Sequence, residues 1–307
     1  MSSQSTDPAP SSTLDDGAVT HNTAPTQFAE VDGIRFAYRR FGDPIGTPVV
    51  LLQHFMGNLD TYDPAITDAL AQGREVILTD NAGVGLSTGA APETVAGMAR
   101  DAASLIDALG LEQVDVFGFS MGGFVAQQIA LDRPELVRRL VLVGTGPRGG
   151  EGMDALDPDV APLFAKAYLP QDLMWLPIFF SPSEASQAAG RRFLDRIRLR
   201  IEDRDRPVSD ATVAAHQAAA REWGAPSRAS FDYLKAIRHP TLVVNGSNDI
   251  VVPTVNSYIL QQHLPNAELI LFPDSNHGSH FQFTEAFSRY VTDFVDRYAS
   301  GGQRFRL

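Results

Sequence analysis

The chain has 307 residues, of which 44% are apolar, so it is long and hydrophobic enough to bury a large core. Its net charge of -12 argues against a nucleic-acid partner and against an anionic membrane surface, because both bind basic patches. The absence of cysteine excludes a thiol nucleophile, disulfides and cysteine metal sites, and it fits a reducing compartment.

The first 24 residues are rich in Ser, Thr, Pro and Asp and contain no Lys, no Arg and no apolar segment of the kind found in signal peptides. This composition predicts a flexible tail over residues 1–24. No apolar stretch approaches the ~18 residues of a membrane span, so we expect a soluble, cytoplasmic protein. From Phe28 to Phe41, alternating apolar residues flank Asp32-Gly33, which predicts a β-hairpin.

Continuous apolar runs follow the hairpin and alternate with helical stretches such as 99–109. Strands that are buried on both faces and separated by helices indicate a mostly parallel sheet, hence an α/β fold. Ligands of such sheets bind at the carboxyl ends of the strands. The expected strands are centred near Leu51, Val76, Val114, Leu140, Leu242 and Leu269.

A glycine-flanked serine stands between one of these strands and the next helix, in the segment Gly118-Phe119-Ser120-Met121-Gly122. A tight strand-to-helix turn crowds its neighbours, and the two glycines remove Cβ atoms that would clash there. The helix that starts at Met121 directs unpaired N–H groups and its positive dipole end toward the serine, which favours an oxyanion. We therefore predict that Ser120 is a nucleophile.

A serine hydroxyl needs a base to take its proton, and a third group must orient that base. Candidates for both follow later strands. Asp249 lies just after the apolar segment 240–246, and His277 lies in the loop after the segment 267–272. The order along the chain is Ser120, Asp249, His277.

These segments together resemble the α/β-hydrolase family from about Gln27 to Tyr298. The segment 49–57 resembles the oxyanion-loop strand, 77–87 the next strand with its turn, and 276–278 the histidine loop. The resemblance implies a triad of Ser120, Asp249 and His277, with the N–H groups of Phe55 and Met121 as the oxyanion hole. It also places the base immediately before Gly278, which leaves His280 a structural or supporting role.

Two positions depart from the family pattern. Gln53-His54 stands where the family usually has His-Gly, and Ala82 stands where it usually has an arginine that forms an ion pair. We interpret His54 either as part of the substrate pocket or as a packed structural residue.

The strand pattern stops between Gly144 and about Ser230, where helical segments are expected at 160–169, 183–201 and 210–223. We interpret this as a helical cap over 146–229, inserted into a core of 25–145 and 230–307. Trp175 lies in its apolar stretch 173–180 and either lines the substrate pocket or packs the cap against the core. The arginines between 191 and 200 are interpreted as a solvated helix face, with a dimer contact or an anionic-substrate site as the alternatives.

The expected reaction is acyl transfer to water, with an apolar small-molecule ester or lactone as the substrate. Carbon-carbon bond hydrolysis and cofactor-free perhydrolysis use the same triad and remain open, as does a hydrolase-like protein that binds without turnover. A serine rather than an aspartate at the turn argues against haloalkane dehalogenase and epoxide hydrolase chemistry. We expect no cofactor and no metal, because H-E-x-x-H and phosphate-loop patterns are absent, while a homo-oligomer remains open.

Overall fold

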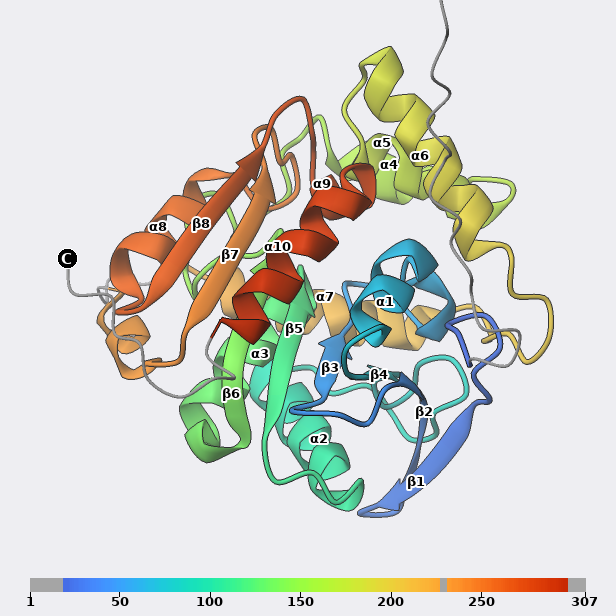
Figure 1. Ribbon diagram of the computed structural model, residues 1–307. Coiled ribbons are helices and arrows are strands. Elements are labelled where there is room, and N and C mark those ends of the chain that lie inside the picture. Colours follow the sequence, from blue (N-terminus) through green and yellow to red (C-terminus); the bar gives the residue numbers. More distant parts are fainter. Residues whose placement is uncertain (1–18, 227–230, 298–307) are drawn as a thin grey trace, which may run out of the picture.

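The computed structural model describes residues 19–226 and 231–297. An eight-stranded sheet with the order β1-β2-β4-β3-β5-β6-β7-β8 forms its centre (Figure 1). β1, β2 and β4 pair in antiparallel fashion and all other neighbours are parallel, which confirms the predicted mostly parallel α/β sheet. The strands are β1 (Gln27–Val31), β2 (Ile34–Gly42), β3 (Val49–Leu52), β4 (Glu75–Thr79), β5 (Val114–Phe119), β6 (Val137–Val143), β7 (Thr241–Gly246) and β8 (Ala267–Phe272).

The predicted hairpin at the start of the sheet is confirmed. β1 and β2 pair from Gln27 opposite Tyr38 to Val31 opposite Ile34. The two residues between them have positive φ angles, 50° at Asp32 and 81° at Gly33, as two-residue hairpin turns of the primed type require.

Helices cover both faces of the sheet. Side chains of α1 and α10 join one hydrophobic cluster, and side chains of α2, α3 and α8 join a second cluster on the other face. Within the described residues, no helix is both long enough and apolar enough to cross a membrane. The helices of the core are α1 (Pro64–Ala71), α2 (Val95–Ala108), α3 (Met121–Asp132), α8 (Val255–His263), α9 (Ser279–Gln282) and α10 (Thr284–Asp296), with 3₁₀-helices η1 (Leu59–Thr61), η2 (Pro134–Leu136) and η4 (Phe231–Ala236).

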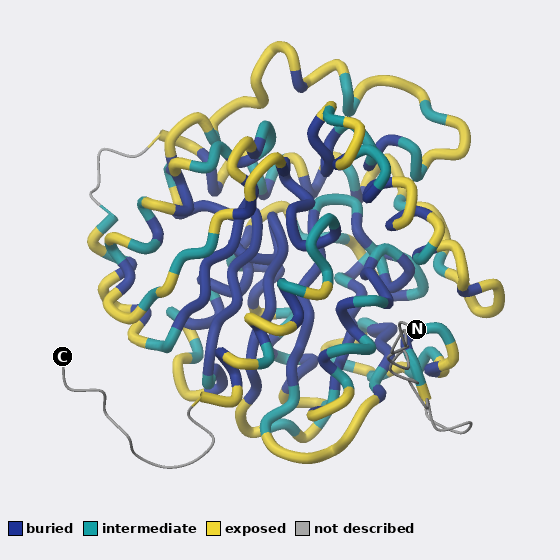
Figure 2. The backbone as a smooth tube through the Cα atoms, turned by 45° about the horizontal axis from the view of Figure 1, so that its top comes forward, coloured by how far each residue is buried: buried dark blue, intermediate teal, exposed yellow. Residues whose placement is uncertain are grey.

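The continuous apolar strands bury both of their faces. In β3, Val49 and Leu51 point into one cluster, while Val50 and Leu52 point into the other. Successive side chains of a strand face opposite sides, so a strand between two helical layers must be apolar throughout. Figure 2 shows the result, with buried strands at the centre and exposed loops at the periphery.

The segment between β6 and β7 is helical, as predicted, although two of its helices are shorter than expected. Its elements are α4 (Ala161–Ala165), η3 (Gln171–Met174), α5 (Trp175–Phe179), α6 (Glu184–Ile197) and α7 (Asp210–Gly224). The helix expected over 160–169 spans only Ala161–Ala165, and the backbone is already extended at Lys166. We call residues 146–226 the inserted segment.

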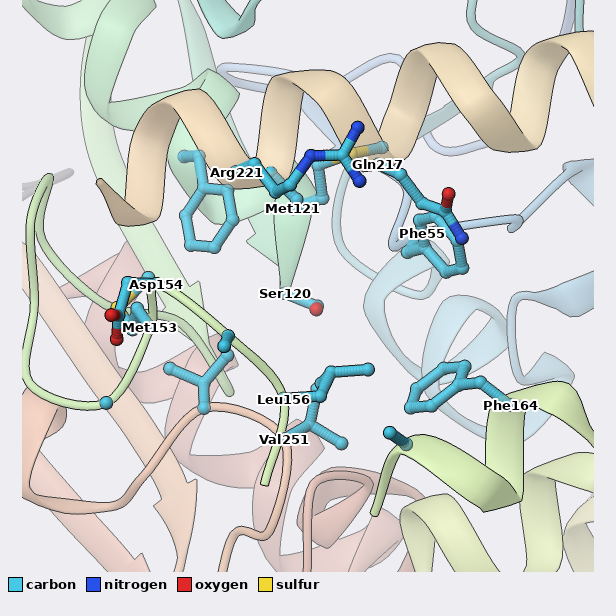
Figure 3. Close-up of a pocket in the computed structure, with 16 residues that line it drawn as sticks. Phe55, Ser120, Met121, Met153, Asp154, Leu156, Phe164, Gln217, Arg221 and Val251 are labelled. Atoms are coloured by element: carbon cyan, nitrogen blue, oxygen red, sulfur yellow. The ribbon is translucent and has the colours of Figure 1, made fainter. Parts of the chain in front are cut away.

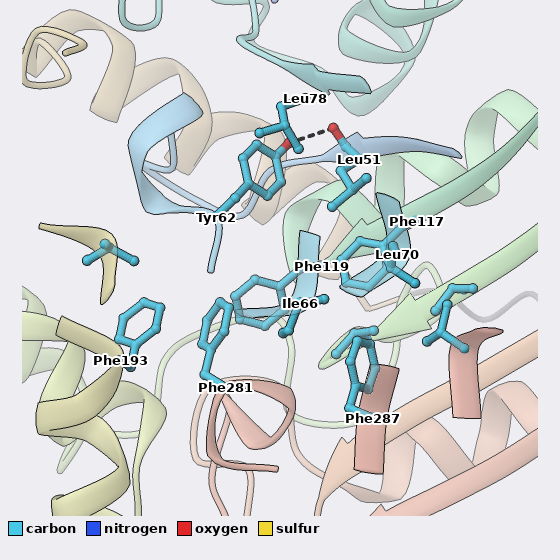
Figure 4. Packing of buried hydrophobic residues seen from close by; sticks show 14 of the residues in the cluster. Leu51, Tyr62, Ile66, Leu70, Leu78, Phe117, Phe119, Phe193, Phe281 and Phe287 are labelled. Carbon is cyan, nitrogen blue, oxygen red and sulfur yellow. Dashed lines mark hydrogen bonds between the residues drawn. The ribbon is translucent and has the colours of Figure 1, made fainter. Parts of the chain in front are cut away.

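The inserted segment packs against both hydrophobic clusters. Phe193 of α6 stacks on Phe281 with 4.3 Å between ring centroids, and Phe281 in turn contacts Phe119 at the end of β5 (Figure 4). On the other face of the sheet, Trp223 of α7 stacks on Phe124 of α3 at 5.4 Å. Two apolar seams therefore join the insertion to the core.

The tail predicted over residues 1–24 is wrong at its end, because the chain already contacts the rest of the protein between His21 and Ala24. His21 and Ala24 are buried. The buried Arg200 guanidinium donates hydrogen bonds to the backbone carbonyls of His21, Asn22 and Ala24. The prediction was wrong for this stretch because its anchor is a side chain from the distant inserted segment. Residues 1–18 lie outside the described part of the chain.

Candidate active site

Ser120 occupies the sharp turn between β5 and α3. Its φ of 55° and ψ of -118° are strained for a residue with a side chain. A Cβ on Gly118 would lie 2.4 Å from the carbonyl oxygen of Gly122, and a Cβ on Gly122 would lie 2.1 Å from that of Leu52. Both glycines are therefore required by close backbone approach, as the sequence pattern suggested.

Hydrogen bonds hold the strained turn in place. The Ser120 N–H donates to the Val143 carbonyl in the neighbouring strand at 2.8 Å. The Ser120 carbonyl accepts from the Gly123 N–H and from the Thr145 hydroxyl, both at 2.9 Å. The Ser120 side chain remains free of these contacts and points into a cavity (Figure 3).

Three buried side chains form a hydrogen-bonded series at the carboxyl end of the sheet. The Nε2 atom of His277 lies 2.9 Å from the Ser120 Oγ, and its Nδ1 lies 2.8 Å from the Oδ2 of Asp249. An ionised aspartate only accepts hydrogen bonds, so the Nδ1 of a neutral His277 carries the proton. Its Nε2 is then the acceptor for the Ser120 hydroxyl. The structure thus brings together the serine, histidine and aspartate that the sequence analysis selected.

The loops after β7 and β8 hold the aspartate and the histidine in this geometry. The other carboxylate oxygen of Asp249 accepts from the backbone N–H groups of Val251 and Val252, at 2.8 and 3.0 Å. The Asn276 side-chain oxygen accepts from the Ile250 N–H and from the His277 N–H. Sequence reasoning missed Asn276, because it joins two loops that are adjacent only in the folded chain.

The loop after β3 carries Phe55, the expected partner of Met121 in the oxyanion hole. Both residues line the cavity beside Ser120. The unusual Gln53 organises this loop, since its amide donates to the Asn58 carbonyl at 2.6 Å and to the Thr61 hydroxyl at 2.8 Å. It thereby holds the chain close to the cavity without the glycine that the family usually has at this loop.

The two pocket candidates, His54 and Trp175, are not among the described residues that line the cavity with Ser120. Trp175 is buried and stacks on Phe179 at 4.7 Å. His54 contacts both rings, and burial lowers its pKa to about 3, so the ring is neutral. The packing interpretation left open by the sequence therefore holds for both residues.

His280, the alternative base, lies away from the serine in the core. Its ring packs between Phe119 and Phe281, with centroid distances of 4.4 and 3.8 Å. Burial lowers the pKa of His280 well below its usual value. These contacts fit the structural role that the resemblance implied.

The cavity at Ser120 has a volume of about 410 Å³ and is bounded by both the core and the inserted segment. Phe55, Met121, Phe124 and Val251 come from the core, and their side chains are apolar (Figure 3). Residues 152–156, Ala161 and Phe164 close one side, and Gln217, Ala220 and Arg221 of α7 close another. Sequence reasoning did not find this wall, because most of its residues lie in loops and short helices without a periodic pattern.

A second polar cluster joins the core to the inserted segment just after β4. The Leu59 N–H is shared between Asp80 of the core and Asp205 of the inserted segment, at 3.0 and 2.8 Å. Burial, followed by the charge of Asp60, raises the pKa of Asp205 to about 6. Burial, followed by the charge of Asp205, raises the pKa of Asp80. Arg39, which pairs with Asp60 at 2.8 Å, partly offsets the rise in both pKa values through its positive charge.

No group of three or more histidine, cysteine, aspartate and glutamate side chains suited to a metal ion occurs among residues 19–226 and 231–297. The cavity itself places Ser120, which is hydrogen bonded to His277, beside mostly apolar side chains.

The fold and this site define a hydrolase of the α/β class. A family model described as alpha/beta hydrolase fold matches residues 47–284, and the chain belongs to that family. It is similar to a 2-hydroxymuconate semialdehyde hydrolase of Pseudomonas putida, with 31% identity over 73% of this chain and 78% of the relative. A poly(3-hydroxyalkanoate) depolymerase of Ectopseudomonas oleovorans is 32% identical over 79% of this chain and 82% of its own length. A solved alpha/beta hydrolase fold protein from Chitinophaga pinensis has 42% identity and a TM-score of 0.85, covering 91% of this chain and all of that one (100%).

Proposed function

We propose that the protein is a serine hydrolase that cleaves a carboxylic ester or a lactone through an acyl-enzyme intermediate. The observation that carries this proposal is the series of hydrogen bonds from Ser120 through His277 to Asp249, which opens on the cavity. A nucleophile, a base and an orienting carboxylate in this arrangement are the requirements for nucleophilic acyl transfer.

In the first half of the reaction, the Ser120 Oγ attacks the carbonyl carbon of the substrate while His277 Nε2 takes the hydroxyl proton. The negative charge moves to the carbonyl oxygen, where the N–H groups of Phe55 and Met121 stabilise it. The bond to the leaving oxygen then breaks, and His277 returns the proton to that oxygen. Water repeats the sequence on the acyl-enzyme, while Asp249 keeps Nδ1 protonated and the ring oriented.

The cavity supports an apolar acyl or alcohol group near the serine, because its core wall consists of Phe55, Met121, Phe124 and Val251. We further propose that residues 146–229 act as a cap, which sets the substrate range by closing the cavity opposite these residues.

Carbon-carbon bond hydrolysis is the second candidate, and one relative favours it. That relative is named for a semialdehyde, whereas the depolymerase is named for a polyester, and both are about equally similar to this chain. The two reactions differ in whether the leaving group is an oxygen or a carbon, so the choice can be made with substrates.

The test compares p-nitrophenyl esters of increasing acyl length, a set of lactones and a set of diketones, with the wild type and with Ser120→Ala. The expected result is turnover of esters or lactones by the wild type and loss of nearly all turnover in Ser120→Ala, which should fold normally. A serine-directed phosphonate should label Ser120 alone. Turnover of the diketones only would favour the second candidate, and absence of all turnover would favour a binding protein.

A further inference from the structure

The wall that α7 contributes to the cavity is polar, unlike the core wall. Ala220 and Arg221 follow Gln217 by three and four residues, so all three lie on one face of the helix. Figure 3 shows Gln217 and Arg221 extending from α7 on the side of the cavity where Ser120 lies. The remaining polar residues that line the cavity are Ser120 and Asp154.

The polar atoms of the Gln217 and Arg221 side chains form no hydrogen bond or ion pair with the rest of the described chain. Other polar side chains of α7 are used structurally: Thr212 donates to the Gly83 carbonyl at 2.8 Å, and the indole N–H of Trp223 donates to the Gly146 carbonyl at 3.2 Å. The guanidinium of Arg221 and the amide of Gln217 thus keep their donors available to a molecule in the cavity.

The charge on the Ser120 side of the cavity comes from Arg221. In Figure 3 the carboxylate of Asp154 lies at the far end of the cavity and points away from Ser120. Gln217 and Arg221 are exposed, while apolar side chains form most of the remaining lining of the cavity. The wall that α7 contributes therefore carries a positive charge, although the whole chain carries a net charge of -12.

We propose that Gln217 and Arg221 form an anion-recognition element that selects substrates bearing a carboxylate at a distance from the reacting carbonyl. This inference deepens the proposed function and rests on it, since it places the reacting carbonyl at Ser120. The planar guanidinium of Arg221 can bind both carboxylate oxygens, and the Gln217 amide adds a donor one helical turn away. An apolar chain between carboxylate and carbonyl matches the apolar wall between Arg221 and Ser120.

The test uses two esters of the same length and different charge: mono-p-nitrophenyl adipate, which ends in a carboxylate, and its methyl ester, which is neutral. Release of p-nitrophenol gives kcat/KM for each. We expect the wild type to prefer the acid by up to about fivefold, the range of an ion pair made by an exposed guanidinium. Added NaCl should reduce this preference, because salt screens the attraction.

Variants locate the source of the preference. Arg221→Met should reduce the ratio of the two kcat/KM values to near one, Arg221→Lys should keep part of it, and Gln217→Leu should reduce it less than Arg221→Met. Arg191→Met is the matched control, since it removes the same charge from an exposed position on α6 that does not line the cavity. A wild type without preference, or a preference that survives Arg221→Met, would overturn the proposal.

A binding measurement separates this proposal from the proposed function. In the Ser120→Ala background, calorimetry with the same two esters should show tighter binding of the acid, and the added Arg221→Met change should abolish the difference. Equal binding would refute anion recognition whatever the chemistry. Undiminished ester turnover by Ser120→Ala would instead refute the nucleophile and leave the binding result to be judged on its own.

Discussion

The two sides of the cavity are built in different ways. On the core side, Ser120, His277 and Asp249 are buried, and each side chain is hydrogen bonded to the next. On the side of the inserted segment, Gly152, Asp154, Ala155 and Leu156 are exposed, although they line the same cavity. The contrast indicates a division of labour in which rigid core loops supply the reaction and a lightly packed wall supplies selectivity.

The largest expected effect is on the core side. His277→Ala and Asp249→Asn should each lower kcat by orders of magnitude, roughly 10⁴-fold for the aspartate, because Ser120 then loses its base or the correct tautomer. His280→Ala should lower the melting temperature through lost packing and reduce kcat far less. If His280→Ala proves the more damaging to kcat, the assignment of the base is wrong.

A substitution at the turn tests how rigid the core side is. Gly122→Ala places a Cβ 2.1 Å from the Leu52 carbonyl oxygen, so the backbone around Ser120 must move. We expect both a lower melting temperature and a large loss of kcat. Gly73→Ala is the control, since a Cβ there meets no atom within 4 Å and should change neither quantity appreciably.

Substitutions of Trp175 and Leu156 distinguish a packing role from a role in substrate selectivity within the inserted segment. Trp175→Ala removes a buried ring, which should cost about 3 kcal/mol or more in the free energy of unfolding. Leu156→Ala removes a cavity-lining side chain that is 41% exposed, so it should alter the ranking of acyl chain lengths with little effect on stability. Thermal melting measures the change in stability, and kcat/KM over an ester series measures the ranking of acyl chain lengths. The reverse pattern would place the selective wall at Trp175.

The smallest expected effect concerns the carboxyl pair that joins the insertion to the core. The pKa of Asp205 is raised to about 6, above the ~3.9 of an unfolded aspartate. The folded state therefore holds a proton that the unfolded state has lost, and its stabilising effect is complete below about pH 4 and lost as the pH rises through about 6.

Asp205→Asn removes the contribution of Asp205 to this pH dependence, while a contribution of Asp80 remains. The melting temperature of the variant relative to the wild type should therefore rise between about pH 4 and 7, by roughly 2–4 °C for each kcal/mol gained. Glu202→Gln is the control, since Glu202 is exposed and close in sequence. An unchanged difference between Asp205→Asn and wild type across this range would show that the carboxyl pair does not titrate as inferred.

Sequence reasoning worked best where a local pattern has one structural solution. The glycines around Ser120, the Asp32-Gly33 turn and the continuous apolar strands each predicted the element that is observed. Ser120, Asp249 and His277 each follow an expected strand. Their proximity could be predicted because the carboxyl ends of parallel strands share one edge of a sheet.

Long-range contacts were missed. The arginines between 191 and 200 were interpreted as a solvated helix face, yet Arg196 pairs with the buried Asp63 at 2.6 Å and Arg200 is itself buried. Nothing in the local pattern distinguishes these two from exposed neighbours such as Arg191. Asp63 is 133 positions away from Arg196, and the backbone carbonyls that Arg200 binds are 176 to 179 positions away, so only the folded chain reveals these contacts.

The two apolar seams of the inserted segment have a consequence for how new substrate ranges can arise. α5, α6 and α7 are tied to the core through Phe193 and Trp223, so replacing the whole insertion would require both seams to be rebuilt at once. Residues 151–159 carry almost no buried side chains, yet several of them line the cavity. Mutations can accumulate in this stretch at little cost to folding, and it is the natural target for a library aimed at altered specificity.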